Sequence, residues 1–193
     1  YSTAMIDTIR RRIRVARGEE PGDLLLEDGF IVNVDSGQVV PGSVVIADGV
    51  VAGVGAYGWD AAERVALDGR FVTPGLVDAH MHIESTLLTP AAFAAVVVPR
   101  GTTAVIADPH EIGNVLGEAG VQAMLDASEG LALDCLFMAP SCVPASPFET
   151  PGFHLDAAAI ERLLDHDRVI GLAEMMNFPG VLAGDPEVVA KIA

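Results

Sequence analysis

The chain has 193 residues, of which 51% are hydrophobic, and it carries a formal net charge of −16 at pH 7. This composition excludes a disordered or fibrous chain, and the acidic balance argues against a nucleic-acid partner, because phosphate binding needs a basic surface. No run of about 18 apolar residues occurs, so no membrane span is predicted. Two cysteines, Cys135 and Cys142, are too few for a disulfide framework and suit a reduced, cytoplasmic protein.

The first part of the chain is predicted to form a helix and then a small β domain. Apolar side chains recur at helical spacing in residues 2–17, so residues 1–22 are assigned to an N-terminal helix. Its cluster of five arginines is interpreted as a solvated helix face. Over residues 23–73, short β-forming runs alternate with turn dipeptides such as Asp28-Gly29 and Pro41-Gly42. This pattern predicts a small antiparallel, β-sandwich-like domain.

The remainder, residues 74–193, is predicted to hold about four β/α units. Long apolar runs predict strands, and amphipathic segments predict the helices between them. The expected strands are 76–80, 102–107, 133–139 and 169–173, and the expected helices are 90–98, 115–128 and 156–164. Continuously apolar strands that alternate with helices indicate a buried parallel sheet, in either a doubly wound fold or a (β/α) barrel. No Gly-x-Gly-x-x-Gly follows the first strand, which disfavours dinucleotide binding.

Polar and ionisable side chains collect after each of these four strands. In chain order they are His80, His82 and Glu84, then Asp108, His110 and Glu111, then Ser141 and Cys142, and finally Glu174. Active sites of barrels and doubly wound sheets form at the carboxyl ends of the strands, so the sequence predicts a site there. His154 and His166 lie in loops and are predicted to be surface residues.

The spacing of His80 and His82 predicts a metal site. Alternate side chains of a strand share a face, so both imidazoles point the same way. Glu174 could add an oxygen, and two histidines with one carboxylate form a recurrent catalytic metal set. Asp108, His110 and Glu111 are then candidates for proton transfer or for orienting ligands. Alternatively, His110 and Glu111 simply cap and begin the next helix.

Several stretches resemble a known family. Residues 74–82, Pro-Gly-Leu-Val-Asp-Ala-His-Met-His, resemble the first-strand signature of the amidohydrolase superfamily. Four further stretches resemble, within that superfamily, the metal-dependent adenine deaminases of bacteria and archaea. They are His-Ile-Glu-Ser at 82–85, Gly-Thr-Thr-Ala-Val-Ile-Ala-Asp-Pro-His-Glu-Ile-Gly-Asn-Val at 101–115, Pro-Ser-Cys-Val-Pro-Ala at 140–145 and Gly-Leu-Ala-Glu-Met-Met-Asn-Phe-Pro-Gly at 171–180.

The resemblance implies a (β/α)8 barrel that hydrolyses adenine, a small purine, to hypoxanthine and ammonia. It implies a two-metal centre with manganese or iron, zinc being a further option, in a cytoplasmic homo-oligomer. His80 and His82 match the paired histidine ligands, and Glu174 matches the bridging carboxylate. The catalytic residues are predicted to be Asp108, His110 and Glu111, and the substrate-binding residues Glu84 and Ser141.

Two alternatives stay open, one about the reaction and one about whether the chain is catalytic at all. One is another amidohydrolase activity, such as opening a cyclic amide. The other is a non-catalytic fragment, because a closed barrel typically needs about 250 residues. The chain opens without Met at Tyr1 and stops just after a helix start at Asp185-Pro186. We therefore expect an N-terminal portion that self-associates and is inactive by itself.

Overall fold

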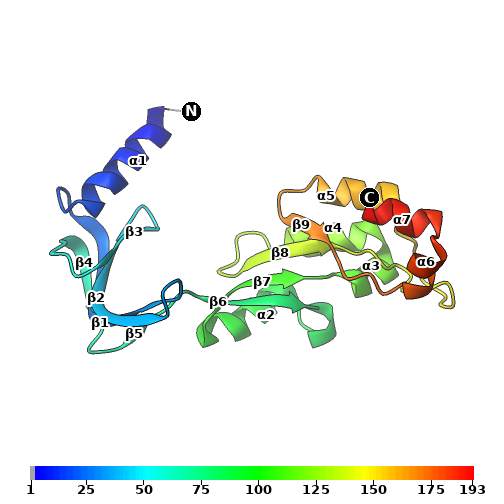
Figure 1. The fold of residues 1–193 in the computed structure, drawn as a ribbon, viewed down its shortest axis with the longest axis horizontal. Helices are drawn as coiled ribbons and strands as arrows, with labels where there is room; N and C mark the ends of the chain where they lie inside the picture. The colour runs from blue at the N-terminus through cyan, green and yellow to red at the C-terminus, as the bar shows by residue number, and fades with distance from the viewer. Residues whose placement is uncertain (1–2) are drawn as a thin grey trace. The chain divides into compact units, whose positions relative to one another are not determined.

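A computed structural model describes residues 3–193 (Figure 1), and the chain divides into two compact units between Pro74 and Gly75. The first two residues of the predicted N-terminal helix lie outside the described residues. Within residues 3–193, no helix is long and apolar enough to cross a membrane.

The first unit begins with helix α1, Thr3–Ala16, which contacts strands β2 and β3 of the sheet that follows. Arg10, Arg14 and Arg17 are exposed, as the predicted solvated face requires, whereas Arg11 and Arg12 are partly buried against the sheet. The Arg11 guanidinium lies 2.6 Å from Asp23 Oδ1 and 2.5 Å from Asp48 Oδ1. The bond from Arg11, followed by one from the backbone N–H of Asp48, holds the pKa of the Asp23 carboxyl below its usual range. The helix is therefore tied to the start of β1 and to the β2–β3 turn.

Five strands of the first unit form one sheet, where the sequence predicts a sandwich-like domain. They are β1 Gly22–Asn33, β2 Gln38–Ala47, β3 Val50–Gly55, β4 Ala61–Ala66 and β5 Phe71–Val72. The order is β3-β2-β1-β4, and β5 also pairs with β1. The prediction of an antiparallel unit holds for β1, β2 and β3 only, because β4 and β5 run parallel to β1.

Two predicted turns are wrong, and both lie inside strands. Asp28, with φ of 60°, forms a bulge in β1, where the register slips by one residue between Leu26 and Gly29. Pro41 lies within β2 opposite Phe30 of β1. The β2–β3 ladder begins only at Ser43, so β2 has no second neighbour at Pro41. The missing proline N–H therefore breaks no ladder bond.

The second unit is a four-stranded parallel sheet with helices between its strands, as predicted. The strands, in the order β6-β7-β8-β9, are β6 Leu76–Met81, β7 Thr102–Ala107, β8 Asp134–Ala139 and β9 Val169–Leu172 (Figure 1). The helices are α2 Pro90–Val97, α3 His110–Leu116, α4 Glu118–Ala127, α5 Ala157–Leu164, α6 Phe178–Ala183 and α7 Pro186–Ile192, with short 3-10 turns at Glu84–Thr86 and Val98–Arg100. The single helix predicted at 115–128 is two helices, because Gly117 with φ of 64° interrupts it.

The core of this unit lies against one face of the sheet. Alternate strand residues Val105, Cys135 and Phe137 are buried together with Leu125 of α4 and Ile160 of α5. The prediction that the first strand is buried is wrong: Leu76 and Val77 of β6 are each 61% exposed. The physical reason is position, since β6 is an edge strand that pairs only with β7.

Candidate metal centre

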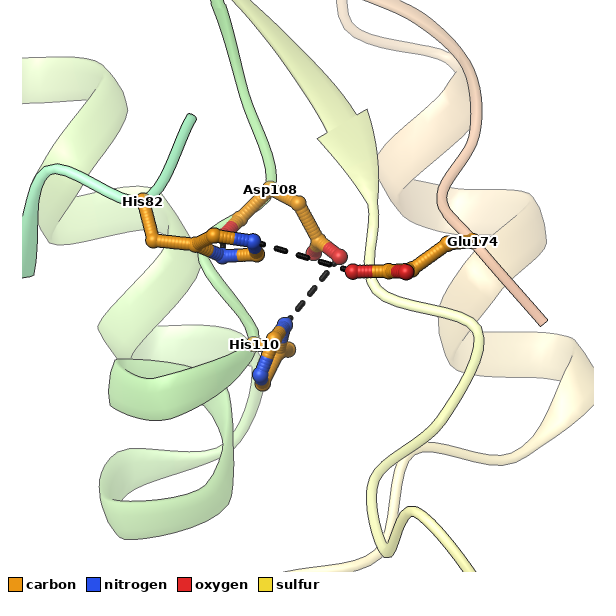
Figure 2. Close-up of side chains that lie close together, drawn as sticks. All are labelled: His82, Asp108, His110 and Glu174. Atoms are coloured by element: carbon orange, nitrogen blue, oxygen red, sulfur yellow. Dashed lines mark hydrogen bonds and ion pairs between the residues drawn. The ribbon is translucent and has the colours of Figure 1, made fainter. Parts of the chain in front are cut away.

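The carboxyl ends of the parallel strands bring the predicted site residues together. His80 lies in β6 and His82 just after it, Asp108 follows β7, His110 begins α3, and Glu174 follows β9. Figure 2 shows His82, Asp108, His110 and Glu174 pointing toward one another. Each of these four offers a ligand atom within 4.8 Å of the others. The parallel register thus collects imidazole and carboxylate groups from three strands at one edge.

The hydrogen bonds of His82 determine which of its ring nitrogens can bind a metal. His82 Nδ1 lies 2.8 Å from the backbone oxygen of Asp108. A carbonyl only accepts, so in the neutral ring Nδ1 carries the proton and Nε2 keeps its lone pair. Such a bond from the second ring nitrogen is the usual support of a metal-binding histidine. His82 is therefore prepared to bind through Nε2.

Three donor atoms surround one point at spacings that suit a divalent ion. His80 Nε2 lies 3.3 Å from His82 Nε2 and 3.4 Å from Glu174 Oε1, and His82 Nε2 lies 3.7 Å from the same oxygen. A tetrahedral ion with bonds of about 2.0–2.1 Å would separate its ligands by about 3.4 Å. The predicted metal set of His80, His82 and Glu174 fits this test. His80 and Glu174 are about half exposed, which leaves one side of the set open.

A second group of donors adjoins the first. Asp108 is almost fully buried, and its Oδ2 lies 3.1 Å from His110 Nδ1, whereas its Oδ1 has no hydrogen-bond partner within residues 3–193. Hydrogen bonding to Asp108 raises the pKa of the His110 imidazole above its usual range. A buried carboxylate oxygen without a partner is costly, and a cation bound here would satisfy it. Asp108 and His110 therefore count as possible ligands as well as proton carriers.

Glu111 lies on the other side of His82. Its Oε1 accepts from the Ser85 hydroxyl at 2.5 Å, and its Oε2 lies 3.3 Å from His82 Nδ1. Burial raises the pKa of the Glu111 carboxyl, but the Ser85 bond, its own backbone N–H and the two nearby histidines outweigh burial and lower it overall. Ser85 belongs to the motif at residues 82–85, but the sequence predicted no role for it.

Glu84 supports the first turn of α3. Its Oε1 accepts from the backbone N–H of Ile112 at 3.3 Å, while its Oε2 has no partner within the described residues. Burial raises the pKa of the Glu84 carboxyl. The alternative interpretation of His110 and Glu111 as the opening residues of a helix is correct for their position, because both lie in the first turn of α3. The same turn directs both side chains to the cluster.

Ser141 and Cys142 follow β8 and are both buried. The Ser141 hydroxyl donates to the backbone oxygen of Glu174 at 2.5 Å, so it contacts a site residue directly. The substrate contact predicted for Ser141 stays a prediction. His154 is exposed as predicted. His166 is half-buried, and its Nδ1 accepts from the Arg168 N–H at 3.1 Å. Neither histidine belongs to the cluster.

The sequence profile of the amidohydrolase family matches residues 71–193, which is more than half of the chain. The chain belongs to the amidohydrolase family. Members of this family depend on metal ions, and the donor set described above is consistent with that property. The resemblance to the amidohydrolase superfamily, which was inferred from the motif at residues 74–82, is thereby confirmed.

The most similar relatives of this amidohydrolase include two adenine deaminases. The one from Syntrophobacter fumaroxidans is 53% identical over 182 residues, which cover 94% of this chain and 31% of the relative. The one from Archaeoglobus fulgidus is 46% identical over 190 residues, covering 98% of this chain and 34% of the relative. The chain thus spans about a third of the length of the curated relatives it matches.

Solved structures support the fold. The L-hydantoinase (dihydropyrimidinase) from Arthrobacter aurescens superposes with a TM-score of 0.57 at 20% identity, over 78% of this amidohydrolase and 32% of that chain. An N-acyl-D-glutamate deacylase from Bordetella bronchiseptica, in complex with zinc and a phosphonate inhibitor, gives a TM-score of 0.55 at 17% identity. The likeness establishes the (β/α)-barrel type of fold for the parallel unit and carries no information on the substrate.

Proposed function

We propose that the full-length protein is a metal-dependent adenine deaminase, which converts adenine and water to hypoxanthine and ammonia in the cytoplasm. The observation that carries this proposal is the 46–53% identity to adenine deaminases over nearly the whole chain. The convergent donor atoms of His80, His82 and Glu174 support it, because hydrolytic deamination needs an activated water.

His80, His82 and Glu174 would hold the first metal ion, and Asp108 with His110 offers donors for a second. The chemistry that such ions supply is Lewis-acid activation of water, whose pKa falls to about 7 in well-built sites. Imidazole and carboxylate donors suit manganese, iron and zinc. These five donor residues exceed what one ion needs from protein in an open catalytic site, which is why we propose two ions.

The chain's own acid–base groups would manage the protons of the reaction. Replacing the amino group of adenine by oxygen transfers a proton from water to the departing ammonia. Glu111, held by Ser85, lies beside the donor set and can carry that proton; His110, held by Asp108, can do so only where its Nε2 does not bind the second ion. Glu84 remains our candidate for substrate contact, because its Oε2 lacks a partner within the described residues.

The test is an assay of the full-length protein for ammonia release from adenine, with bound metal measured in the same samples. His80→Ala and His82→Ala should each lose metal and activity, because each removes one nitrogen from a small donor set. The matched control is His154→Ala, which removes an exposed histidine outside the cluster. It should leave both quantities unchanged.

A cyclic imide assayed beside adenine separates the proposal from the alternative of cyclic-amide opening. Turnover of the imide without turnover of adenine would replace the proposed substrate but keep the metal site. Full metal content in both histidine variants would overturn the metal site itself.

A further inference from the structure

We propose that Ser141 and Cys142, at the end of β8, are positioning residues that fix the backbone around Glu174 and thereby place its carboxylate for metal binding. We refer to these two residues as the β8 clasp. The inference rests on the proposed function, because it takes Glu174 as a metal ligand. It explains how that ligand is held in position. It also gives a role to Cys142, which no other part of the site requires.

The sheet register brings the clasp and Glu174 together. Ala139 of β8 lies opposite Leu172 of β9, and the Ala173 N–H donates to the Ala139 oxygen at 2.8 Å. Ser141 and Glu174 each follow this pair by two residues, so the alignment of the strands continues past their ends. Beyond Leu172, however, no strand ladder holds the chain. Side chains must replace the missing backbone bonds.

Ser141 supplies the first of these replacements. Its hydroxyl lies 2.5 Å from the Glu174 backbone oxygen and 3.2 Å from Cys142 Sγ. A hydroxyl has one proton, and the shorter distance directs it to the carbonyl. The Ser141 side chain is buried, so water does not compete for the bond. The backbone oxygen of Ser141 in turn accepts from Lys191 Nζ of α7 at 3.3 Å, which anchors the clasp itself.

Cys142 supplies the second replacement. Its Sγ accepts from the backbone N–H of Met176 at 2.9 Å and lies 3.5 Å from Met175 Sδ. The clasp therefore contacts the backbone at Glu174 and again two residues later. The backbone is thus held before Glu174 by the Ala173 N–H bond and after it by the clasp, which leaves little freedom to turn the Glu174 side chain away from the site.

The Glu174 carboxylate depends on this backbone support. Its side chain is about half exposed, and the basic side chains within 4 Å of its carboxylate in the described residues are His80 and His82. His80 lies in β6 and His82 directly follows it, at the far side of the sheet order from β9. The carboxylate must thus reach across the sheet edge, and a shift of the Glu174 backbone would move it out of the donor set.

The experiment measures Mn²⁺ affinity of the full-length protein by competition with a chelator, with the unfolding temperature of the metal-free form as a separate readout. Ser141→Ala should weaken Mn²⁺ binding about 10- to 100-fold, the usual cost of losing a group that orients a ligand. Ser141→Thr keeps the hydroxyl and should restore most of the affinity. The matched control is Ser128→Ala, which removes another buried serine that donates to a backbone oxygen, Leu125 O at 2.9 Å, outside the cluster.

Cysteine variants give an independent test if the added methyl of threonine disturbs packing. Cys142→Ala removes the acceptor for Met176, whereas Cys142→Ser keeps one, so the alanine variant should bind Mn²⁺ more weakly than the serine variant. Cys135→Ala, at a buried cysteine in the core, is the control for loss of a thiol. It should lower thermal stability without changing Mn²⁺ affinity.

A double-mutant cycle with Glu174→Gln separates the two proposals. If the clasp acts through Glu174, Ser141→Ala causes no further loss of Mn²⁺ affinity in the Glu174→Gln background. If Glu174→Gln alone leaves Mn²⁺ affinity intact, the proposed metal role of Glu174 is wrong. If Glu174→Gln weakens binding but Ser141→Ala and Cys142→Ala do no more than their controls, the metal site stands and the clasp is wrong.

Discussion

At the scale of single residues, the site depends on a few backbone contacts that orient its side chains. The bond from His82 Nδ1 to the Asp108 oxygen leaves Nε2 as the metal-facing atom. Glu111 is fixed instead by a side-chain hydrogen bond from Ser85. These contacts join residues that are distant in sequence, so each ligand depends on the strand next to its own.

Glu174→Gln tests whether this residue is a ligand or a proton carrier. The amide keeps the shape but loses the charge that offsets the positive charge of bound ions, so metal occupancy and ammonia release should both fall. Both are measured on the full-length protein, with Glu161→Gln, at an exposed carboxylate of α5, as control. Retention of full metal with loss of turnover alone would make Glu174 an acid–base group instead.

At the scale of elements, the sequence predicts the four parallel strands well, because each is a compact apolar run between helix signals. The sequence prediction fails at Asp28 and Pro41, where a turn was predicted but the residues lie within paired strands. The exposure of Leu76 and Val77 was also unpredictable, since an edge strand and a central strand have the same apolar composition.

The candidate site shows the same contrast between what a local sequence pattern predicts and what depends on strand pairing. The donors at the ends of the strands could be found, because their order along the chain mirrors the order of the strands. The contacts Ser85–Glu111 and Ser141–Glu174 could not, because they depend on the register between strands, which no local pattern encodes.

The start of β6 is packed closely against β7, and Gly75→Ala tests this contact. A Cβ at Gly75 would lie 2.0 Å from Thr103 Oγ1 and 2.7 Å from Thr103 Cβ, so rotating the threonine cannot relieve the clash. We expect destabilisation of about 1–3 kcal/mol, typical of overpacking, measured by urea unfolding. Gly58→Ala, where an added Cβ meets nothing within 4 Å, should be tolerated. Equal stability of both variants would contradict the packing argument.

Helices α4 and α5 are joined by a paired ion bridge with a predictable pH dependence. Arg162 Nε and Nη2 lie 3.0 Å and 2.7 Å from the two oxygens of Glu118. The Arg162 bond holds the pKa of the Glu118 carboxyl below its usual 4.5. A lowered folded-state pKa stabilises the fold above the unfolded-state value, and this contribution is lost as the pH falls through the folded-state pKa.

Glu118→Gln should therefore lower the unfolding free energy at neutral pH, and the difference from the unaltered protein should shrink below about pH 4.5. Added salt should also reduce this difference in unfolding free energy, because the Arg162–Glu118 pair is partly exposed. Urea unfolding of both proteins across pH 3–7 measures the effect. A difference that stays constant over this range would show that Glu118 acts by packing rather than by charge.

At the scale of the whole molecule, the parallel sheet ends in two strands that each pair on one side only, β6 and β9. Apolar side chains on these strands, among them Leu76, Val77 and Ile170, are at least half exposed. Unpaired strand edges and exposed apolar surface favour association. The net charge of −16 opposes it by repulsion between copies.

We therefore predict that the 193-residue chain alone self-associates, and more strongly as ionic strength rises. Salt screens the repulsion between acidic chains but leaves the apolar contacts in place. Light scattering coupled to size-exclusion chromatography at low and high salt would measure the mass. A monomer under both conditions would contradict the prediction that the exposed strand edges drive association.

The single tryptophan has a practical consequence. Trp59 is buried beneath α1, where its Nε1 donates to the Ala16 oxygen at 2.9 Å, and it stacks with Tyr57. The only other tyrosine is Tyr1, so every tryptophan and tyrosine precedes Pro74. Tryptophan and tyrosine fluorescence therefore reports on the first unit, while the unit that carries the proposed metal ligands contributes none. A fluorescence melt compared with a far-ultraviolet circular dichroism melt would separate the unfolding of the two units without any label.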